Sequence, residues 1–243
     1  MLKADVAIIG GTGIGERLMA LGGEGFSTET AHGLMSGAML EHDGIRIALV
    51  QRHSAGHRTP PHLVNYHALA VGLRDMGVRA CLASAAVGSL RSDWGVGTMA
   101  VCRDFLDLTG RRLTLYENEV KHVDFSEPMP GSRAIAQACQ ELGLAVQDDA
   151  VYLGADGPRY ETPAEIRMMR LLGGDVVGMT ASSEAILMRE AGVDYGCLAV
   201  VTNLGTGLDP AAAPDHGAVT DVMKARGATA VEILLRAAKI VMS

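Results

Sequence analysis

Residues 4–16, ADVAIIGGTGIGE, carry the pattern that decides the fold. Residues 6–9 form a short apolar run that stops at a cluster of glycines. A continuous apolar run bounded by turn residues is typical of a strand buried on both faces of a sheet. The same pattern returns along the chain and predicts further strands at residues 45–50, 80–84, 99–102, 151–154, 175–179 and 195–202.

Helix-like segments alternate with these strands. They are predicted at residues 62–76, 131–142, 163–172, 183–191 and 215–241. The third segment has a clear start, with Thr162 as N-cap, Pro163 at the first helical position and Glu165 completing a capping box. Strands that alternate with helices predict an α/β fold with a largely parallel sheet. Because no repeat or linker divides the chain, we expect residues 1–243 to form one domain.

The composition excludes several classes of protein. Of 243 residues, 48% are hydrophobic and only 4% aromatic, so we expect an aliphatic core and not a disordered chain. Lysine and arginine number 21 against 28 aspartate and glutamate, a net charge of −7 that argues against nonspecific binding to nucleic acid or to an anionic membrane. No apolar run approaches a membrane span and no secretory signal is recognised, so a cytoplasmic location is expected.

The cysteines are widely spaced and show no metal-binding pattern, so we expect them to be buried and reduced. They are Cys81, Cys102, Cys139 and Cys197.

Glycine is in excess, with 30 residues, and one cluster follows the first strand. In GGTGIG, residues 10–15, Gly11 and Gly13 fit the start of a dinucleotide fingerprint, but Glu16 stands where the third glycine belongs. A Walker A loop also fails, since no Gly-Lys-Ser/Thr follows. Two interpretations remain: a tight turn, or a phosphate cradle in which backbone N–H groups are joined by the Thr12 hydroxyl.

A second stretch, QRHSAGHRTPPHLVNYH at residues 51–67, places basic side chains directly after the predicted strand at 45–50. Open α/β sheets bind ligands at the carboxyl ends of their strands, so this stretch suits an anion. Metal binding by His53 and His57 is disfavoured because the stretch lacks carboxylates. A solvated basic loop is the alternative.

Two further stretches carry side chains that suit a flat heterocycle. In GPRYETPAEIR, residues 157–167, Tyr160 and Glu161 precede a helix and offer an aromatic ring beside a carboxylate. In VVTNLGTG, residues 200–207, Asn203 ends an apolar strand, where its amide needs a partner. A turn-forming asparagine is the alternative for Asn203.

Taken in order and over most of the chain, several stretches resemble the trimeric purine nucleoside phosphorylase and methylthioadenosine phosphorylase family. They are AIIGGTGI, QRHSAGHRTPPHLVNYHAL, AVGSLR, HVDFSEP, GPRYETPAEIRMM, DVVGMT, VVTN and HGAVTDVM. The resemblance implies a single α/β domain with a mixed, largely parallel central sheet flanked by helices. It implies cleavage of a purine nucleoside by inorganic phosphate, giving free base and a pentose 1-phosphate. Phosphate is then a co-substrate, with no cofactor or metal, and the expected assembly is a homotrimer or a dimer of trimers.

The resemblance also implies residue roles at the phosphate. The side chains of Thr12, Arg52, His53 and Thr180, with the backbone of Ala86, are expected to bind it. His53 is expected to be catalytic as well. The physical reason is that cleavage builds positive charge on the sugar, and a phosphate held in line is both nucleophile and counter-charge.

At the base, the resemblance implies that Tyr160 stacks on the purine while Glu161 and Asn203 read its edge. Asn203 is expected to be catalytic, because its amide both accepts from N7–H and donates to O6. Members of the family that use 6-aminopurines have aspartate at this position and again two residues on, whereas this chain has Asn203 and Gly205. Glu161 accepts the N1–H that only a 6-oxopurine carries, so a 6-oxopurine is the expected base.

Around the sugar, the resemblance implies that Met179 lies under the ribose. His122 is expected to reach the site of a neighbouring subunit, and His216 to lie near the 5′ substituent. Whether that substituent is a hydroxyl or a methylthio group stays open. His57 and Asn65 belong to the matched loop without assigned roles.

The sequence departs from the family pattern at two places. Ala85 stands where threonine or asparagine is usual, and Ser182-Ser183 replaces a Val-Pro pair. The alternatives are therefore a methylthioadenosine phosphorylase that tolerates Asn203, or a purine-binding homologue with weakened catalysis. A dinucleotide-dependent oxidoreductase is disfavoured by the broken glycine spacing.

Overall fold

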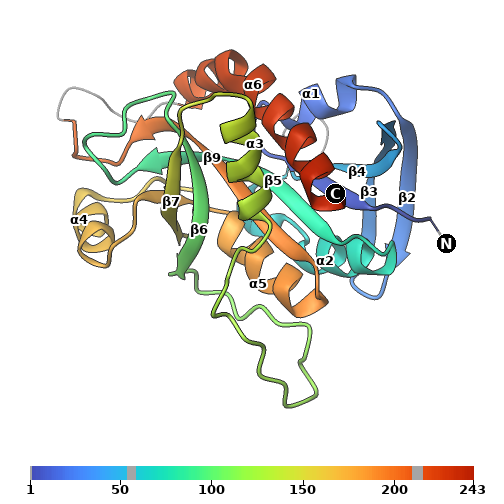
Figure 1. Ribbon diagram of the computed structural model, residues 1–243. Coiled ribbons are helices and arrows are strands. Elements are labelled where there is room, and N and C mark those ends of the chain that lie inside the picture. The colour runs from blue at the N-terminus through green and yellow to red at the C-terminus, as the bar shows by residue number, and fades with distance from the viewer. Residues whose placement is uncertain (1, 54–58, 210–215) are drawn as a thin grey trace.

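The computed structural model describes residues 2–53, 59–209 and 216–243. In these residues the strands form one mixed sheet of nine strands in the order β2-β3-β4-β1-β5-β8-β7-β6-β9. The α/β architecture is confirmed, with a sheet between two layers of helices (Figure 1).

The centre of the sheet is the expected parallel part. β1 (Val6–Gly10) pairs in parallel with β4 (Ile45–Gln51) on one side and β5 (Ala80–Ser89) on the other. Successive side chains of β1 pack into two different core clusters, as expected of a strand buried on both faces.

A hairpin that the sequence analysis missed extends this edge. β2 (Glu24–Thr30) and β3 (Gly33–His42) pair with each other and with β4 in antiparallel fashion. β2 is largely exposed, so its sequence EGFSTET lacks the apolar run by which the buried strands were recognised. The hairpin makes the sheet more mixed than expected.

The second half of the sheet closes on itself. β6 (Met99–Asp107) lies beside β7 (Gln147–Gly154), and β7 lies beside β8 (Val176–Gly178). β9 (Asp194–Leu204) pairs with both β6 and β5, and β8 pairs with the end of β5. The pairings β5-β8-β7-β6-β9-β5 therefore form a ring, which places the ends of β5, β8 and β9 around one region.

Two layers of helices cover the sheet. α2 (Tyr66–Asp75) and α5 (Ala181–Ala191) pack on one face, while α1 (Gly15–Ala20), α3 (Ser132–Glu141) and α6 (His216–Met242) pack on the other (Figure 1). α4 (Pro163–Leu171) has a small core of its own against β8, and its predicted capping box is confirmed.

The helix predicted from residue 62 starts later. A 3-10 turn (Pro61–Leu63) comes first, and Asn65 caps α2 by accepting from the backbone N–H of Ala68 at 3.0 Å. Asn65 also donates to the carbonyl of His32 at 2.7 Å. These contacts give Asn65 a structural role.

All four cysteines are buried and free, as expected. Among the helices of the described ranges, none has the length and apolar composition needed to cross a lipid bilayer.

Candidate active site

A pocket of about 330 Å³ opens at the edge of the sheet where β1, β4, β5 and β9 end. Because β1, β4, β5 and β9 run parallel, their carboxyl ends meet at this edge together with the amino end of α5. Of the predicted site residues whose side chains the structure describes, all except His122 line the pocket: Thr12, Arg52, His53, Ala86, Tyr160, Glu161, Met179, Thr180 and Asn203.

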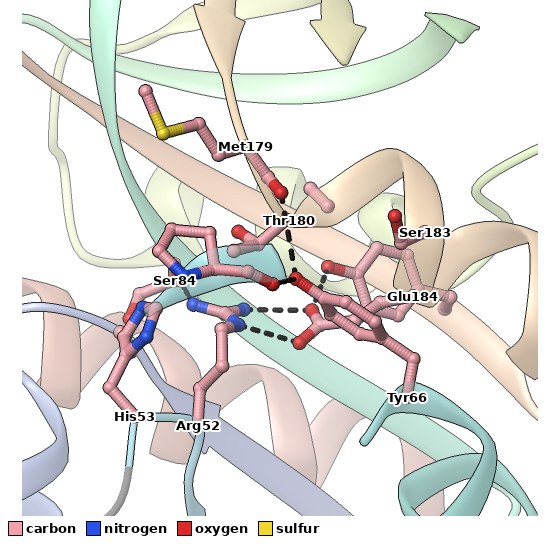
Figure 2. A network of polar contacts seen from close by, with 12 residues as sticks. Arg52, His53, Tyr66, Ser84, Met179, Thr180, Ser183 and Glu184 are labelled. Atoms are coloured by element: carbon pink, nitrogen blue, oxygen red, sulfur yellow. Dashed lines mark hydrogen bonds and ion pairs between the residues drawn. The ribbon is translucent and has the colours of Figure 1, made fainter. Parts of the chain in front are cut away.

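The residues predicted to bind phosphate come from four separate elements. Thr12 follows β1, Arg52 and His53 follow β4, Ala86 lies in β5, and Thr180 is the N-cap of α5. The backbone N–H of Arg52 donates to the carbonyl at the end of β1 at 3.1 Å, which ties the first two elements together. Figure 2 shows Arg52, His53 and Thr180 gathered in one region.

Arg52 is held by a buried ion pair. Its Nε and Nη2 donate to the two carboxylate oxygens of Glu184 at 2.6 and 2.7 Å, and its Nη1 donates to the carbonyl of Ser84 at 2.8 Å (Figure 2). The side chains of Arg52 and Glu184 are 1% and 0% exposed. Burial opposes the charge of Arg52, but the attraction of Glu184 outweighs it and raises the pKa of Arg52, so the guanidinium stays charged.

Tyr195 completes this cluster from β9. Its hydroxyl donates to Glu184 at 2.6 Å, so the carboxylate accepts three hydrogen bonds. Burial, and then the negative charge of Glu184, raise the pKa of Tyr195 well above its ordinary value, which keeps the hydroxyl protonated. We call Arg52, Glu184 and Tyr195 the arginine cluster.

Gly11 lets Arg52 approach the backbone. A Cβ at position 11 would lie 2.6 Å from Nη1 of Arg52 and 2.9 Å from the carbonyl of Ser84. At the glycine-rich turn the backbone therefore lies close to the guanidinium. No residue other than glycine fits at position 11 without displacing it.

The amino end of α5 is capped from the sheet. The hydroxyl of Tyr152 in β7 accepts from the backbone N–H groups of Thr180 and Ala181 at 3.1 and 3.2 Å. Thr180 makes no side-chain cap bond, so the start of α5 is fixed by Tyr152.

His53 is oriented by the backbone. Its Nδ1 lies 2.8 Å from the carbonyl of Thr59, so in the neutral ring this contact places the proton on Nδ1. The ring is buried, 6% exposed, and lines the pocket.

Asn203 retains hydrogen-bonding capacity for a ligand. Its Nδ2 donates to the carbonyl of Leu204 at 3.0 Å, and its Oδ1 accepts from the hydroxyl of Thr202 at 3.1 Å. An amide nitrogen has two hydrogens and an amide oxygen two lone pairs. One donor and one acceptor therefore remain on the side chain of Asn203.

Tyr160, Glu161 and Met179 line the same pocket. Burial is the main cause that raises the pKa of Glu161 above its ordinary value, and the nearby charge of Glu165 adds to it. Gly157 makes room for Met179: a Cβ there would lie 3.0 Å from Cε and 3.1 Å from Cγ of the methionine.

Of three further histidines named from the sequence, only His122 has a described side chain. His122 is exposed in the segment between β6 and α3, which projects from the body of the molecule (Figure 1). His216 begins α6, but its side chain lies outside the described residues, as does all of His57.

The two departures from the family pattern have structural partners. Ala85 is buried in the core and does not line the pocket. Ser182 donates to Asp107 at 3.3 Å, and Ser183 lies 3.5 Å from Nη1 of Arg111. These hydroxyls connect α5 to the last residue of β6 and to the segment that follows it.

Sequence reasoning missed Glu184, Tyr195 and Tyr152. Only Glu184 carried a usable signal, since it is a lone carboxylate in the small and apolar stretch ASSEAILM, residues 181–188. The described residues contain no cluster of three His, Cys, Asp or Glu side chains that suits a metal ion.

Comparison with known proteins gives consistent findings. The family model described as Phosphorylase superfamily matches residues 5–239. The chain is 40% identical over 209 residues to a probable S-methyl-5'-thioinosine phosphorylase from Methanopyrus kandleri, covering 84% of this chain and 80% of the relative. It is 38% identical over 206 residues to the 6-oxopurine nucleoside phosphorylase of Pyrococcus furiosus, covering 80% of this chain and 77% of the relative.

A solved structure has the same fold. Methylthioadenosine phosphorylase from Schistosoma mansoni in complex with adenine superimposes with a TM-score of 0.92 at 26% identity, over 99% of this chain and 92% of that chain.

Proposed function

This chain belongs to the Phosphorylase superfamily, and we propose that it cleaves purine nucleosides with inorganic phosphate, preferring 6-oxopurine bases. The products are the free base and a ribose 1-phosphate or 5-methylthioribose 1-phosphate. One observation carries the proposal: a single pocket is lined by the residues predicted to bind phosphate, Arg52 among them, and by the amide of Asn203 with one donor and one acceptor left. The curated relatives named for 6-oxopurine and methylthioinosine substrates support it.

The chemistry follows from charge. As the glycosidic bond breaks, the sugar becomes positive and the purine negative. Phosphate held by Thr12, Arg52, His53, Thr180 and the backbone of Ala86 stabilises the sugar cation and attacks it. Asn203 accepts from a protonated N7 and donates to O6, which makes the base a better leaving group. The proton that the base gains is balanced by the proton that hydrogen phosphate loses when its oxygen bonds to C1′.

The same residues support the base preference. Ionised Glu161 accepts the N1–H of hypoxanthine or guanine, whereas adenine has no proton on N1. A site built to hydrogen-bond one group of the base rejects an analogue that lacks this group by about 10⁴-fold or more. Cleavage of methylthioadenosine is the second candidate, favoured by the solved structure of a methylthioadenosine phosphorylase with the same fold.

We further propose a trimeric cytoplasmic enzyme that needs phosphate but no metal or other cofactor. The projecting segment that carries His122 supports a shared site, because this side chain is exposed and does not line the pocket of its own chain. His216 is proposed to lie near the 5′ substituent.

The proposal is tested by incubating the protein with inosine, methylthioinosine or methylthioadenosine, with and without phosphate. We expect phosphate-dependent release of hypoxanthine, at least ~100-fold faster than release of adenine at equal concentrations. Release without phosphate would indicate a hydrolase. Purine binding without release in any mixture would indicate a homologue that has lost catalysis, and equal rates for both bases would disprove the preference.

The raised pKa of Glu161 predicts a pH-dependent choice between bases. As the pH falls through this raised pKa, Glu161 becomes protonated and no longer accepts N1–H, but it then donates to the unprotonated N1 of adenine. We expect kcat/KM for methylthioadenosine relative to methylthioinosine to rise on acidification from pH 8 to pH 5. Titration of phosphate affects both substrates equally and cancels in this ratio.

The control for this measurement is Glu161→Gln, which has no ionisable group at the base. Its ratio of the two kcat/KM values should be constant over the same pH range. A constant ratio in the unmodified protein would place Glu161 away from N1.

A further inference from the structure

We propose that Glu184, held by Tyr195, is a positioning residue for phosphate, because it fixes the Arg52 guanidinium in the pocket wall in one orientation. The inference deepens the proposed function and rests on it. Neither Glu184 nor Tyr195 lines the pocket, so both act through Arg52.

The hydrogen-bond inventory of the guanidinium supports this role. Arg52 has five N–H groups, of which Glu184 takes one on Nε and one on Nη2, and the Ser84 carbonyl takes one on Nη1. One hydrogen on Nη1 and one on Nη2 remain for a ligand. Bidentate binding by the carboxylate determines the plane of the guanidinium, and thereby the directions of these two hydrogens.

The charge balance supports orientation, and not net charge, as the contribution of Arg52. Among the described residues that line the pocket, Arg52 is the only arginine or lysine, and Glu184 balances its charge at 2.6 Å. Phosphate therefore meets a neutral pair with directed N–H groups and not a free cation. A long, unsupported arginine would lose rotamer freedom on binding phosphate, whereas a buried and paired one has already lost it.

The cluster is held on three sides by buried elements. Glu184 lies on α5, Tyr195 on β9 and the Ser84 carbonyl on β5. Figure 2 shows the carboxylate of Glu184 facing the guanidinium, with Tyr66 on the adjoining helix α2. Because the start of α5 also supplies Thr180, one helix places both a proposed phosphate ligand and the residue that orients a second ligand.

Glu184→Gln tests the proposal with little change of volume. Glutamine keeps one oxygen that accepts from Arg52, but its NH₂ group faces the second N–H of the guanidinium. Because two donors repel each other, the guanidinium rotates. We expect the KM for phosphate to rise about tenfold or more, while the KM for the nucleoside is unchanged. Tyr195→Phe, which removes one hydrogen bond to Glu184, should raise the phosphate KM about two- to fivefold.

The matched control is Glu190→Gln, the same substitution in the same helix. Glu190 accepts from the backbone N–H of Leu115 and lies outside the pocket lining. Loss of the Glu190 carboxylate in Glu190→Gln should leave the phosphate KM unchanged. A purely structural effect of Glu184→Gln would lower the amount of active enzyme and kcat, without separating the two KM values.

Two results would overturn the proposal. An unchanged phosphate KM in Glu184→Gln would show that the carboxylate does not orient Arg52 for phosphate. A lower phosphate KM would show that the unbalanced charge of Arg52, and not its orientation, governs binding.

Direct calorimetric titration with inorganic phosphate keeps this test independent of turnover. If the unmodified protein binds phosphate but cleaves no nucleoside, the proposed function fails, while the binding difference between the unmodified protein and Glu184→Gln still decides the role of Glu184.

Discussion

Replacing Arg52 by methionine is expected to lower the free energy of unfolding by about 3–5 kcal/mol and to abolish phosphorolysis. The stability loss arises because Glu184, 0% exposed, is left as a carboxylate without its counter-charge. The activity loss arises because the pocket loses its oriented N–H donors. Urea denaturation at one fixed protein concentration measures the first effect, since the apparent stability of an oligomer depends on concentration.

Substituting Glu184, alone and together with Arg52, measures the contribution of the ion pair to stability. Glu184→Leu alone should also destabilise by about 3–5 kcal/mol, because it leaves Arg52 buried and unpaired. The double variant Arg52→Met with Glu184→Leu should recover most of that loss, since an apolar pair needs no compensation for desolvation. Adding Tyr195→Phe removes the hydroxyl that has lost its acceptor.

The double variant should be stable yet inactive, which separates the two roles of the arginine cluster. Stability losses that simply add in the double variant would mean that Arg52 and Glu184 do not interact across the core. Full activity in the stable double variant would remove Arg52 from the phosphate site.

Asn203→Asp is expected to abolish the preference for 6-oxopurine bases. An ionised aspartate accepts from a 6-amino group but cannot donate to O6, so kcat/KM for methylthioinosine should fall about 100-fold or more. The ratio of methylthioadenosine to methylthioinosine cleavage should rise by a similar factor. Steady-state kinetics with both substrates at saturating phosphate measure it.

The structure also limits the gain for adenine. In the unmodified protein Nδ2 donates to the Leu204 carbonyl, and an aspartate oxygen there would be repelled by it. A second aspartate at position 205 meets another obstacle, because a Cβ would lie 3.0 and 3.1 Å from Ile166 and 3.1 Å from the Ser89 carbonyl. Asn203→Asp alone is therefore the cleaner test, with a thermal melt as the control for folding.

An unchanged preference in Asn203→Asp would mean that this amide does not contact the purine. In that case the specificity would have to come from Glu161, and the pH-dependent ratio described above would still be seen.

The sequence predicted the buried part of the fold well and the exposed part poorly. The run Val6 to Ile9 was recognisable because a strand covered on both faces is apolar at every position. The hairpin β2-β3 was missed because its edge strand is largely exposed. The ring of pairings through β5, β8 and β9 had no local signal, since strand order depends on contacts between distant segments.

By itself, the sequence determined the α/β class and the residue types of the site, because apolar runs, glycine turns and motifs are local. It named Arg52 and Asn203 without showing what holds them. Only the tertiary structure decided that Arg52 is neutralised by a carboxylate 132 positions along the chain, and that Asn203 keeps one donor and one acceptor. The physical reason is that burial and hydrogen-bond partners are set by segments that meet only after the chain has folded, and these contacts determine what each side chain offers a ligand.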